Sequence, residues 1–151
     1  MKKNLVLLGM MGVGKTTLGK IVAKKQGLEF IDIDAEIEKK NSMTVNKIFE
    51  KKGEKFFRKE EEIQVSRSIK KIKCVIALGG GSFINRVIRE NILKNAISVW
   101  LDVDIKTLRK RIMWNTKRPL LKNNKLKKIN DLYYERRKIY KEANYKIKCE
   151  G

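Results

Sequence analysis

The sequence predicts an α/β fold, with a five-stranded parallel sheet that carries helices on both faces. Apolar runs of strand length alternate with stretches of helical periodicity along the chain. Several of these runs are apolar throughout, as expected of strands that are covered on both faces. The first run ends at Gly9 in a glycine-rich segment, and a helical pattern begins at Lys15 directly after it.

Each expected element follows from its local pattern. The strands are expected at Asn4–Leu8, Leu28–Asp32, Lys73–Leu78, Ala96–Leu101 and Tyr145–Cys149. Helices are expected to begin at or near Lys15, Asp34, Thr44, Gly53, Arg86, Asp104 and Lys128. Thr44 and Asp104 are residue types that cap helix N-termini, and Gly53 can end one helix and begin another. The basic, asparagine-rich stretch between Ile112 and Lys128 contains the only proline and is typical of a mobile loop.

The length fits one domain over residues 1–151, because a single core typically serves about 100–200 residues. No apolar run reaches the roughly 18 residues that a membrane-spanning helix needs. The apolar stretch after Met-Lys-Lys stops at Gly9 without a small-residue cleavage site, so we interpret it as a first strand and not as a signal peptide. We expect a cytoplasmic protein without a membrane partner.

Composition excludes several classes of function. Histidine is absent, which rules out histidine-based triads and zinc sites. Cys74 and Cys149 lie far apart and form no metal-binding pattern. The formal net charge of +20 raises the question of a nucleic-acid partner, but the lysines are scattered and are not interleaved with aromatic residues. We therefore expect small-molecule substrates and no nucleic acid.

The segment from Gly9 to Thr16 satisfies the phosphate-loop pattern of Gly, four residues, Gly, Lys and Ser or Thr. Its glycines let the backbone approach phosphate oxygens closely, and the following helix presents its positive end to the same anion. Lys15 is expected to supply a point charge between the β- and γ-phosphates, and the Thr16 hydroxyl to bind Mg²⁺. The segment therefore predicts the binding of a nucleoside triphosphate.

A phosphate loop also needs a carboxylate for its Mg²⁺, and two strand ends offer one. If the second strand continues to Asp34, then Asp32 and Asp34 point to the same side, one toward the metal and the other toward a substrate hydroxyl. Alternatively, both are strand-end and helix-cap acids. Asp102 and Asp104 follow the fourth strand and are interpreted as a cap for the next helix.

Glycines and arginines indicate a second ligand. Gly79, Gly80 and Gly81 follow a buried strand and would let a ligand lie against the backbone. Lysine outnumbers arginine about three to one, so each arginine stands out as a fork-shaped donor that lysine replaces poorly.

Several separated motifs, taken in order, resemble the shikimate kinase family over nearly the whole chain. They are Gly-Met-Met-Gly-Val-Gly-Lys-Thr, Phe-Ile-Asp-Ile-Asp, Gly-Glu-Lys-Phe-Phe-Arg-Lys-Glu-Glu, Ala-Leu-Gly-Gly-Gly, Arg-Pro-Leu-Leu and Arg-Arg-Lys-Ile-Tyr. The first marks only a phosphate-loop protein, whereas the ordered set is specific to this family. The resemblance implies a three-layer fold with strand order 2-3-1-4-5, and an enzyme that phosphorylates shikimate with ATP in aromatic amino-acid synthesis. We expect it to act as a monomer.

The resemblance also implies a role for each site residue. Nucleotide binding would involve the residues Gly12, Val13, Gly14, Lys15, Thr16, Thr17, Arg111 and Arg118. Thr16 and Asp32 would position Mg²⁺, Lys15 would contact phosphates, and Arg111 would lie along the adenine. Arg118 would stabilise the transferring phosphoryl group from a closing lid at about residues 113–127. Shikimate would be held by Asp34, Arg58, Gly80, Gly81 and Arg136, with Asp34 receiving or orienting the hydroxyl that attacks.

Two departures from the family pattern accompany the resemblance. Lys138 stands where the family often has proline, and the chain stops at Gly151, where the family normally continues with an adenine-contacting loop and a terminal helix. The sequence does not predict how adenine is held. A related kinase of gluconate or of a nucleoside monophosphate, and a catalytically weak phosphate-loop protein that binds nucleic acid, remain alternatives.

Overall fold

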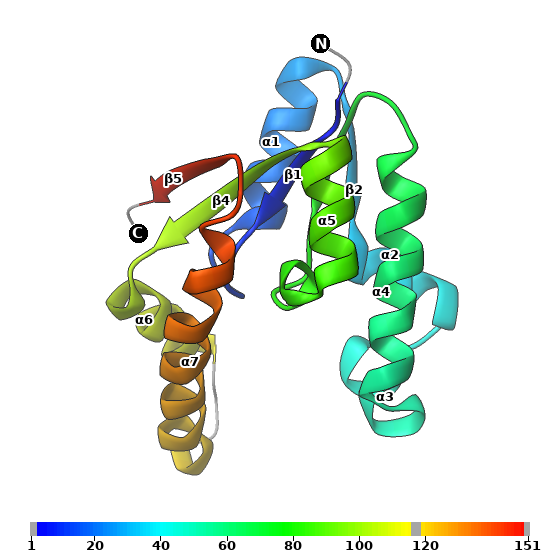
Figure 1. The fold of residues 1–151 in the computed structure, drawn as a ribbon. Coiled ribbons are helices and arrows are strands. Elements are labelled where there is room, and N and C mark those ends of the chain that lie inside the picture. The colour runs from blue at the N-terminus through cyan, green and yellow to red at the C-terminus, as the bar shows by residue number, and fades with distance from the viewer. Residues whose placement is uncertain (1–2, 116–118, 150–151) are drawn as a thin grey trace.

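A computed structural model describes residues 3–115 and 119–149 of the chain. It contains a parallel sheet with helices on both faces (Figure 1). The described strands are β1 (Leu5–Leu8), β2 (Glu29–Asp32), β3 (Cys74–Ala77), β4 (Ile97–Val103) and β5 (Tyr145–Cys149). They lie in the order β2-β3-β1-β4-β5 and are all parallel to their neighbours. The predicted fold class and strand order are confirmed.

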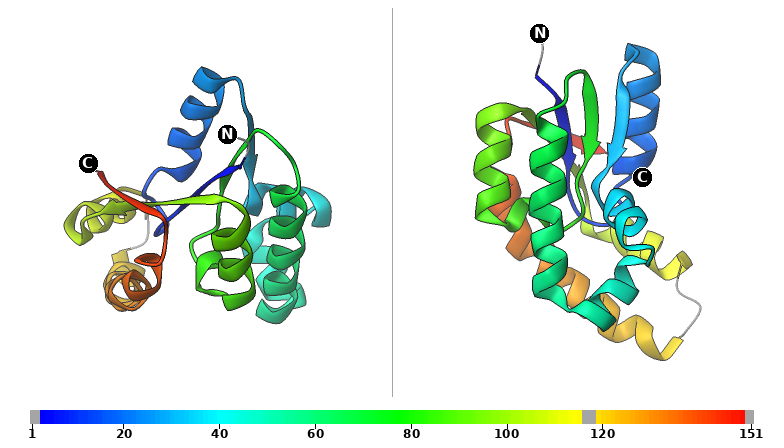
Figure 2. Two further views of the ribbon diagram at one scale, coloured as in Figure 1. Left: turned by 45° about the horizontal axis from the view of Figure 1, so that its top comes forward. Right: turned by 90° about the vertical axis from the view of Figure 1, so that its right-hand side faces the viewer.

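Helices connect the strands and form the outer layers. The described helices are α1 (Lys15–Gln26), α2 (Ile33–Asn41), α3 (Val45–Lys52), α4 (Glu54–Ile69), the 3-10 helix η1 (Ser82–Ile84), α5 (Arg86–Asn95), α6 (Ile105–Asn115) and α7 (Pro119–Tyr140). Helix α1 covers one face of the sheet, and α4 and α5 cover the other (Figure 2). None of the helices within the described ranges is both long and apolar enough to cross a membrane.

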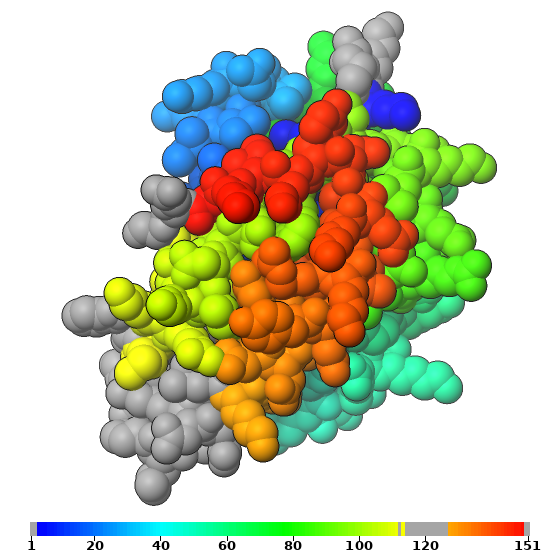
Figure 3. All heavy atoms as spheres, turned by 60° about the vertical axis from the view of Figure 1, so that its left-hand side comes forward, coloured from blue at the N-terminus to red at the C-terminus, as the bar shows by residue number. Residues whose placement is uncertain are grey.

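The core follows from the strand pattern. Every side chain of β3 is buried, and so are nearly all of those of β4, as expected of strands that lie between two helical layers. Helix α1 comes close to the sheet at Gly19, where an added Cβ would lie 2.4 Å from the Phe30 ring. The edge strand β5 lies on the surface of the molecule (Figure 3), where Tyr145 and Ile147 remain 63% and 49% exposed.

The parallel arrangement brings several loops to one edge. Leu8 of β1 pairs with Trp100 of β4, and Asp32 of β2 pairs with Ala77 of β3, so the carboxyl ends of these strands lie side by side. Helix α7 on one side, and α3 with the first turns of α4 on the other, extend beyond this edge (Figure 1). Ligands of open α/β sheets bind at such an edge.

The second strand ends at Asp32, as predicted, and Ile33 already begins α2, because the Asp32 side chain accepts a hydrogen bond from the Ala35 amide and caps that helix. Another sequence prediction is wrong. The stretch expected to form a loop between Ile112 and Lys128 is largely helical, since α6 extends to Asn115 and α7 begins at Pro119. Proline is well suited to the first position of a helix, where its missing N–H has no partner to lose.

Asn4 fastens the start of β1 to the end of α4. Its buried amide nitrogen donates to the carbonyl groups of Ser68, Ile69 and Lys71, and its oxygen accepts from the Cys74 amide at 3.0 Å. An alanine at this position would leave those buried backbone groups without partners.

We expect Asn4→Ala to lower the free energy of unfolding by about 2–3 kcal/mol, because unsatisfied buried groups lose hydrogen bonds without regaining water. Urea unfolding followed by circular dichroism measures this change. The exposed Asn95, whose amide bonds only Asn91 among the described residues, is the matched control, and Asn95→Ala should change stability by less than about 0.5 kcal/mol. Equal losses in both variants would contradict this role for Asn4.

Candidate active site

The loop between β1 and α1 has the backbone of an anion-binding cradle. Gly12 and Gly14 have φ angles of 80° and 96°, a left-handed region that side chains disfavour. Gly14 precedes α1 and provides no side-chain cap, so the first amides of the helix remain available to an anion. The predicted phosphate loop therefore has the local structure that its motif indicates.

Lys15 points back into this loop. Its Nζ donates to the carbonyl oxygens of Gly9 at 2.6 Å and Met10 at 3.2 Å. The pKa of this lysine is lowered to about 8, chiefly by burial and also by the nearby Arg136, whereas the carboxylates of Asp34 and Asp32 oppose the shift. A phosphate group at this position would stabilise the ammonium form by direct attraction.

Thr16 and Asp32 form a pair of hard oxygen ligands beside the loop. The Thr16 hydroxyl donates to Asp32 Oδ2 at 2.8 Å, and Asp32 Oδ1 accepts from the Ala35 amide at 3.1 Å. Asp32 is thus both a helix cap and a neighbour of the phosphate loop, so the two interpretations that the sequence left open are compatible.

Asp34 lies in the first turn of α2, and not on the extension of β2 that the sequence offered as one of two possibilities. Its carboxylate packs against Gly79, where an added Cβ would lie 2.5 Å from Oδ1. The pKa of Asp34 is raised to about 6, chiefly by burial and also by the carboxylates of Glu61 and Asp32, while Lys15 opposes them. This acid is therefore poised to exchange a proton near neutral pH.

Two arginines, one on α4 and one on α7, face the glycine turn that follows β3. Arg58 on α4 donates from Nη1 to Glu61 Oε1 at 2.6 Å, and Glu61 Oε2 accepts from the Ser82 hydroxyl at 2.5 Å. Arg136 on α7 lies against Gly80 and Gly81, and its Nη1 is fully buried. The structure therefore brings Arg58 and Arg136 together, as expected.

The three glycines are needed for space. A Cβ on Gly81 would lie 3.0 Å from Arg58 Nη1, and one on Gly80 would lie 3.2 Å from Arg136 Nη1. The sequence interpretation gave this room to a ligand, whereas part of it is taken by Asp34 and the two guanidinium groups. Small residues here let the charged side chains converge on one point.

The converging groups line two clefts that meet at this turn. One, of about 310 Å³, is lined by Gly12, Lys15, Thr16, Asp32 and Asp34, together with Gly79 and Gly80. The other, of about 540 Å³, is lined by residues that include Arg58, Gly81 and Arg136. The first has the phosphate loop and the second has the guanidinium forks, so the geometry accommodates a phosphate donor and an anionic acceptor side by side.

Sequence reasoning did not identify three supporting residues. Glu61 is 1% exposed and holds Arg58, but nothing in the run of three glutamates marks which one contacts that arginine. Tyr140, which also lies fully buried, donates its hydroxyl to the Gly80 carbonyl at 2.7 Å. Arg137 forms an ion pair with Asp102 at 2.6 Å, so Asp102 is not the helix cap that the sequence suggested. Asp104 does cap α6, by accepting from the Thr107 amide.

The remaining expected nucleotide contacts are only partly described. Arg111 on α6 donates to the Gly12 carbonyl at 2.6 Å, which places its guanidinium beside the phosphate loop. Arg118 lies outside the described residues, and its role remains a prediction.

Comparisons with known proteins agree with this geometry. A family model described as shikimate kinase matches residues 11–151. The shikimate kinase of Bacillus subtilis is 42% identical and aligns with 99% of this chain and 82% of its own length. That of Persephonella marina is 38% identical, over 99% and 90% of the two chains.

Comparison with solved structures also supports a similarity to shikimate kinases. The shikimate kinase from Acinetobacter baumannii in complex with shikimate superposes with a TM-score of 0.91 and 36% identity, over 99% of this chain and 84% of that one. A gluconokinase from Sinorhizobium meliloti covers 98% of this chain and 82% of its own, with a TM-score of 0.57 and 15% identity, and shares the fold alone.

The fold, together with the anion-holding groups at the carboxyl edge of its sheet, defines a P-loop kinase, an enzyme that takes its phosphoryl group from ATP. The matches specify the kind of kinase, and the chain belongs to the shikimate kinase family.

We expect Asp34→Asn to raise the melting temperature at pH 7.5 by about 2–4 °C. Because the pKa of Asp34 is raised in the folded protein, the stability of its protonated form is lost as the pH rises through about 6, and asparagine avoids that loss. Calorimetry at pH 4 and pH 7.5 measures the change, which should be near zero at pH 4. The control is Asp131→Asn at an exposed position of α7, which should not raise the melting temperature. A gain of equal size at both pH values would contradict the raised pKa.

Proposed function

We propose that the two clefts hold the two substrates of one reaction: the γ-phosphoryl group of ATP in the phosphate loop and shikimate between Arg58 and Arg136. The chain is a shikimate kinase, which converts ATP and shikimate into ADP and shikimate 3-phosphate. The proposal assigns individual residues to the steps of that reaction.

One observation carries the assignment. Among the described residues, two side-chain atoms are fully buried and lack a hydrogen-bond partner: Asp34 Oδ1 and Arg136 Nη1. Buried polar atoms are almost always paired, because an unpaired one costs free energy. An acceptor that carries both a hydroxyl and a carboxylate would satisfy both at once. Shikimate has both groups.

The acceptor would be clamped by its carboxylate. Arg58 and Arg136 each present a fork that matches a carboxylate in two hydrogen bonds, and Gly80 and Gly81 leave room for the ring beside them. Arg58 is held in place by Glu61, so little side-chain freedom remains to be lost on binding. The clamp would leave the 3-hydroxyl facing Asp34.

Asp34 would orient that hydroxyl and accept its proton. A pKa of about 6 keeps the carboxylate mostly ionised at neutral pH, yet basic enough to take a proton during transfer. Phosphoryl transfer demands mainly in-line positioning and charge neutralisation. Asp34 would supply the in-line positioning of the attacking hydroxyl.

The nucleotide would lie along the phosphate loop. Amides of Gly12, Val13, Gly14 and Thr17, with the Lys15 ammonium, would surround the phosphates. The Thr16 hydroxyl and the Asp32 carboxylate are oxygen ligands of the kind that Mg²⁺ prefers, and they lie next to each other. When bound there, Mg²⁺ would neutralise phosphate charge.

The roles of Arg111, Arg118 and the lid at residues 113–127 remain predictions from the resemblance. Arg111 already lies beside Gly12, so it is near the path of the nucleotide. Residues of one chain supply both clefts, so we propose that the enzyme acts as a monomer. We place it in the cytoplasm, where ATP is available.

We expect Arg136→Lys to raise the KM for shikimate by about 10- to 100-fold, because one ammonium cannot replace a two-bond fork to a carboxylate. The KM for ATP should change little. A coupled assay of ADP release with varied shikimate measures both constants, and the exposed Arg86 provides the matched control Arg86→Lys. ADP release that is equal with and without shikimate in the parent enzyme would reject the proposed acceptor.

We expect kcat/KM for shikimate to rise with pH through about 6 and then level off, because only the ionised Asp34 can accept a proton. Asp34→Asn should reduce the rate by at least about 100-fold and remove this pH limb. Tryptophan or ligand-displacement titration should show that the variant still binds ATP. A pH profile that keeps the same limb in Asp34→Asn would assign the limb to another group.

A further inference from the structure

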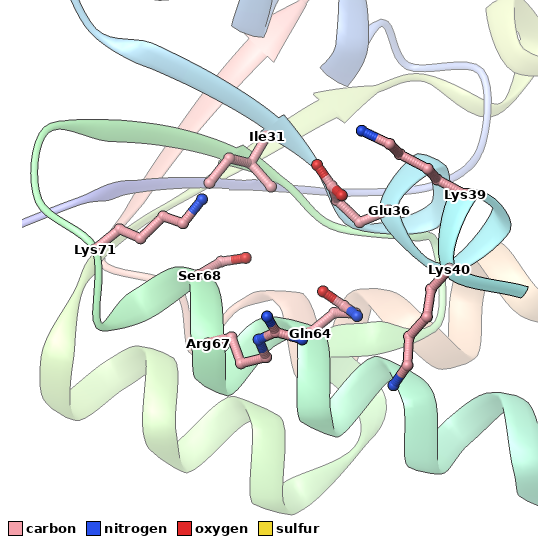
Figure 4. A pocket seen from close by; sticks show the side chains of 8 residues that line it. All are labelled: Ile31, Glu36, Lys39, Lys40, Gln64, Arg67, Ser68 and Lys71. Carbon is pink, nitrogen blue, oxygen red and sulfur yellow. The ribbon is translucent and has the colours of Figure 1, made fainter.

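A third cavity lies away from the two substrate clefts. It has a volume of about 380 Å³ and lies between α2 and the C-terminal half of α4, beside β2 (Figure 4). Its lining residues are Ile31, Glu36, Lys39, Lys40, Gln64, Arg67, Ser68 and Lys71. None of them lines either substrate cleft. The established family activity therefore gives this cavity no role.

The wall formed by α4 contains polar groups without partners. Gln64 and Ser68 are 8% and 4% exposed, and their side chains point into the cavity (Figure 4). The Ser68 carbonyl accepts from Asn4, but neither the Ser68 hydroxyl nor the Gln64 amide has a hydrogen-bond partner within the described ranges. Their polar atoms are not fully buried, since they reach the cavity, so they are available to donate hydrogen bonds to a ligand there.

Cations surround the same opening. Lys71 lies at one side of it and Lys39 at the other, with Arg67 beside Gln64 (Figure 4). Lys40 is occupied by Glu60 at 3.0 Å, and Lys71 is only 3.7 Å from the half-exposed Glu29, a contact too loose to neutralise it. Arg67 forms no ion pair among the described residues and is exposed. Positive charge is therefore available to a ligand.

The combination of donors favours a phosphate group. Arg67 offers a guanidinium fork, Lys71 an ammonium, and Ser68 and Gln64 neutral donors, which together match the several oxygens of a phosphate. Asn4 occupies the carbonyls of Ser68, Ile69 and Lys71 near this cavity, and the full charges of Arg67 and Lys71 exceed the partial negative charge at the end of α4. Glu36 is the one carboxylate in the lining, and it can accept a hydrogen bond from a hydroxyl of the ligand.

We propose that this cavity binds a small phosphomonoester that carries a free hydroxyl group, with the phosphate between Arg67, Lys71 and Ser68 and the hydroxyl at Glu36. The site is separate from the substrate clefts and does not depend on the roles assigned to them. It is a binding site and involves no chemical step.

Calorimetric titration with glycerol 3-phosphate tests this site directly. The full chain is first saturated with Mg²⁺ and ADP, so that the phosphate loop is filled. We expect Arg67→Gln to weaken binding by about tenfold, because it removes a charged fork. Gln64→Leu, which changes no charge, should weaken it several-fold. The control is Arg86→Gln, which removes one exposed arginine elsewhere and should leave binding unchanged.

Each outcome decides the proposal. Equal affinity in the Arg67→Gln and Arg86→Gln variants, or no binding by the parent chain, would overturn it, because the attraction would then be general surface charge or absent. Inorganic phosphate should bind more weakly than glycerol 3-phosphate, and equal affinities would refute the contact with Glu36. If circular dichroism shows that Gln64→Leu does not fold, the affinity of the Arg67→Gln variant still tests the proposal, because Arg67 is exposed. The shikimate-dependent rate of Arg67→Gln should match that of the parent enzyme. A failure of the proposed phosphate site can therefore be distinguished from a failure of the kinase assignment.

Discussion

The burial of several charged groups at one point, two of them with an unpaired atom, is the constraint on which this structure depends. Lys15, Asp34 and Arg136 are drawn out of water at one point, where burial lowers the pKa of the lysine and raises that of the acid. An uncompensated buried charge is costly, and proteins retain it mainly where function requires it. The folded protein bears this free-energy cost before any substrate binds, so substrates bind to groups that are already oriented and dehydrated.

The rest of the fold holds this cluster in place. The parallel register brings the loops after β1, β2 and β3 to one edge, and helices α4 and α7 form walls on either side of it. Glu61 fixes Arg58, and Tyr140 fixes the turn at Gly80 that lies between the two guanidinium groups. Their effect on the reaction is indirect, through the positions of the groups that touch substrates.

The sequence was sufficient where chemistry depends on residue type and spacing. The phosphate loop, the strand order and the convergence of Arg58 and Arg136 were all predicted, because motifs and the resemblance specify them. It was insufficient where the orientation of a helix decides: Glu60 and Glu61 are both buried, and only the placement of α4 shows that Glu61 is the one that holds Arg58. It was wrong where a polar stretch is helical, since Pro119 begins α7 inside the segment that was expected to form a mobile loop.

The most direct test of the account is a crystal structure of this chain with shikimate and with ADP bound in the phosphate loop. We predict that the acid group of shikimate accepts hydrogen bonds from both Arg58 and Arg136, and that one ring hydroxyl donates to Asp34. Arg136 Nη1 and Asp34 Oδ1 would then both have partners. A shikimate molecule bound elsewhere, with these two atoms still unpaired, would contradict the central claim.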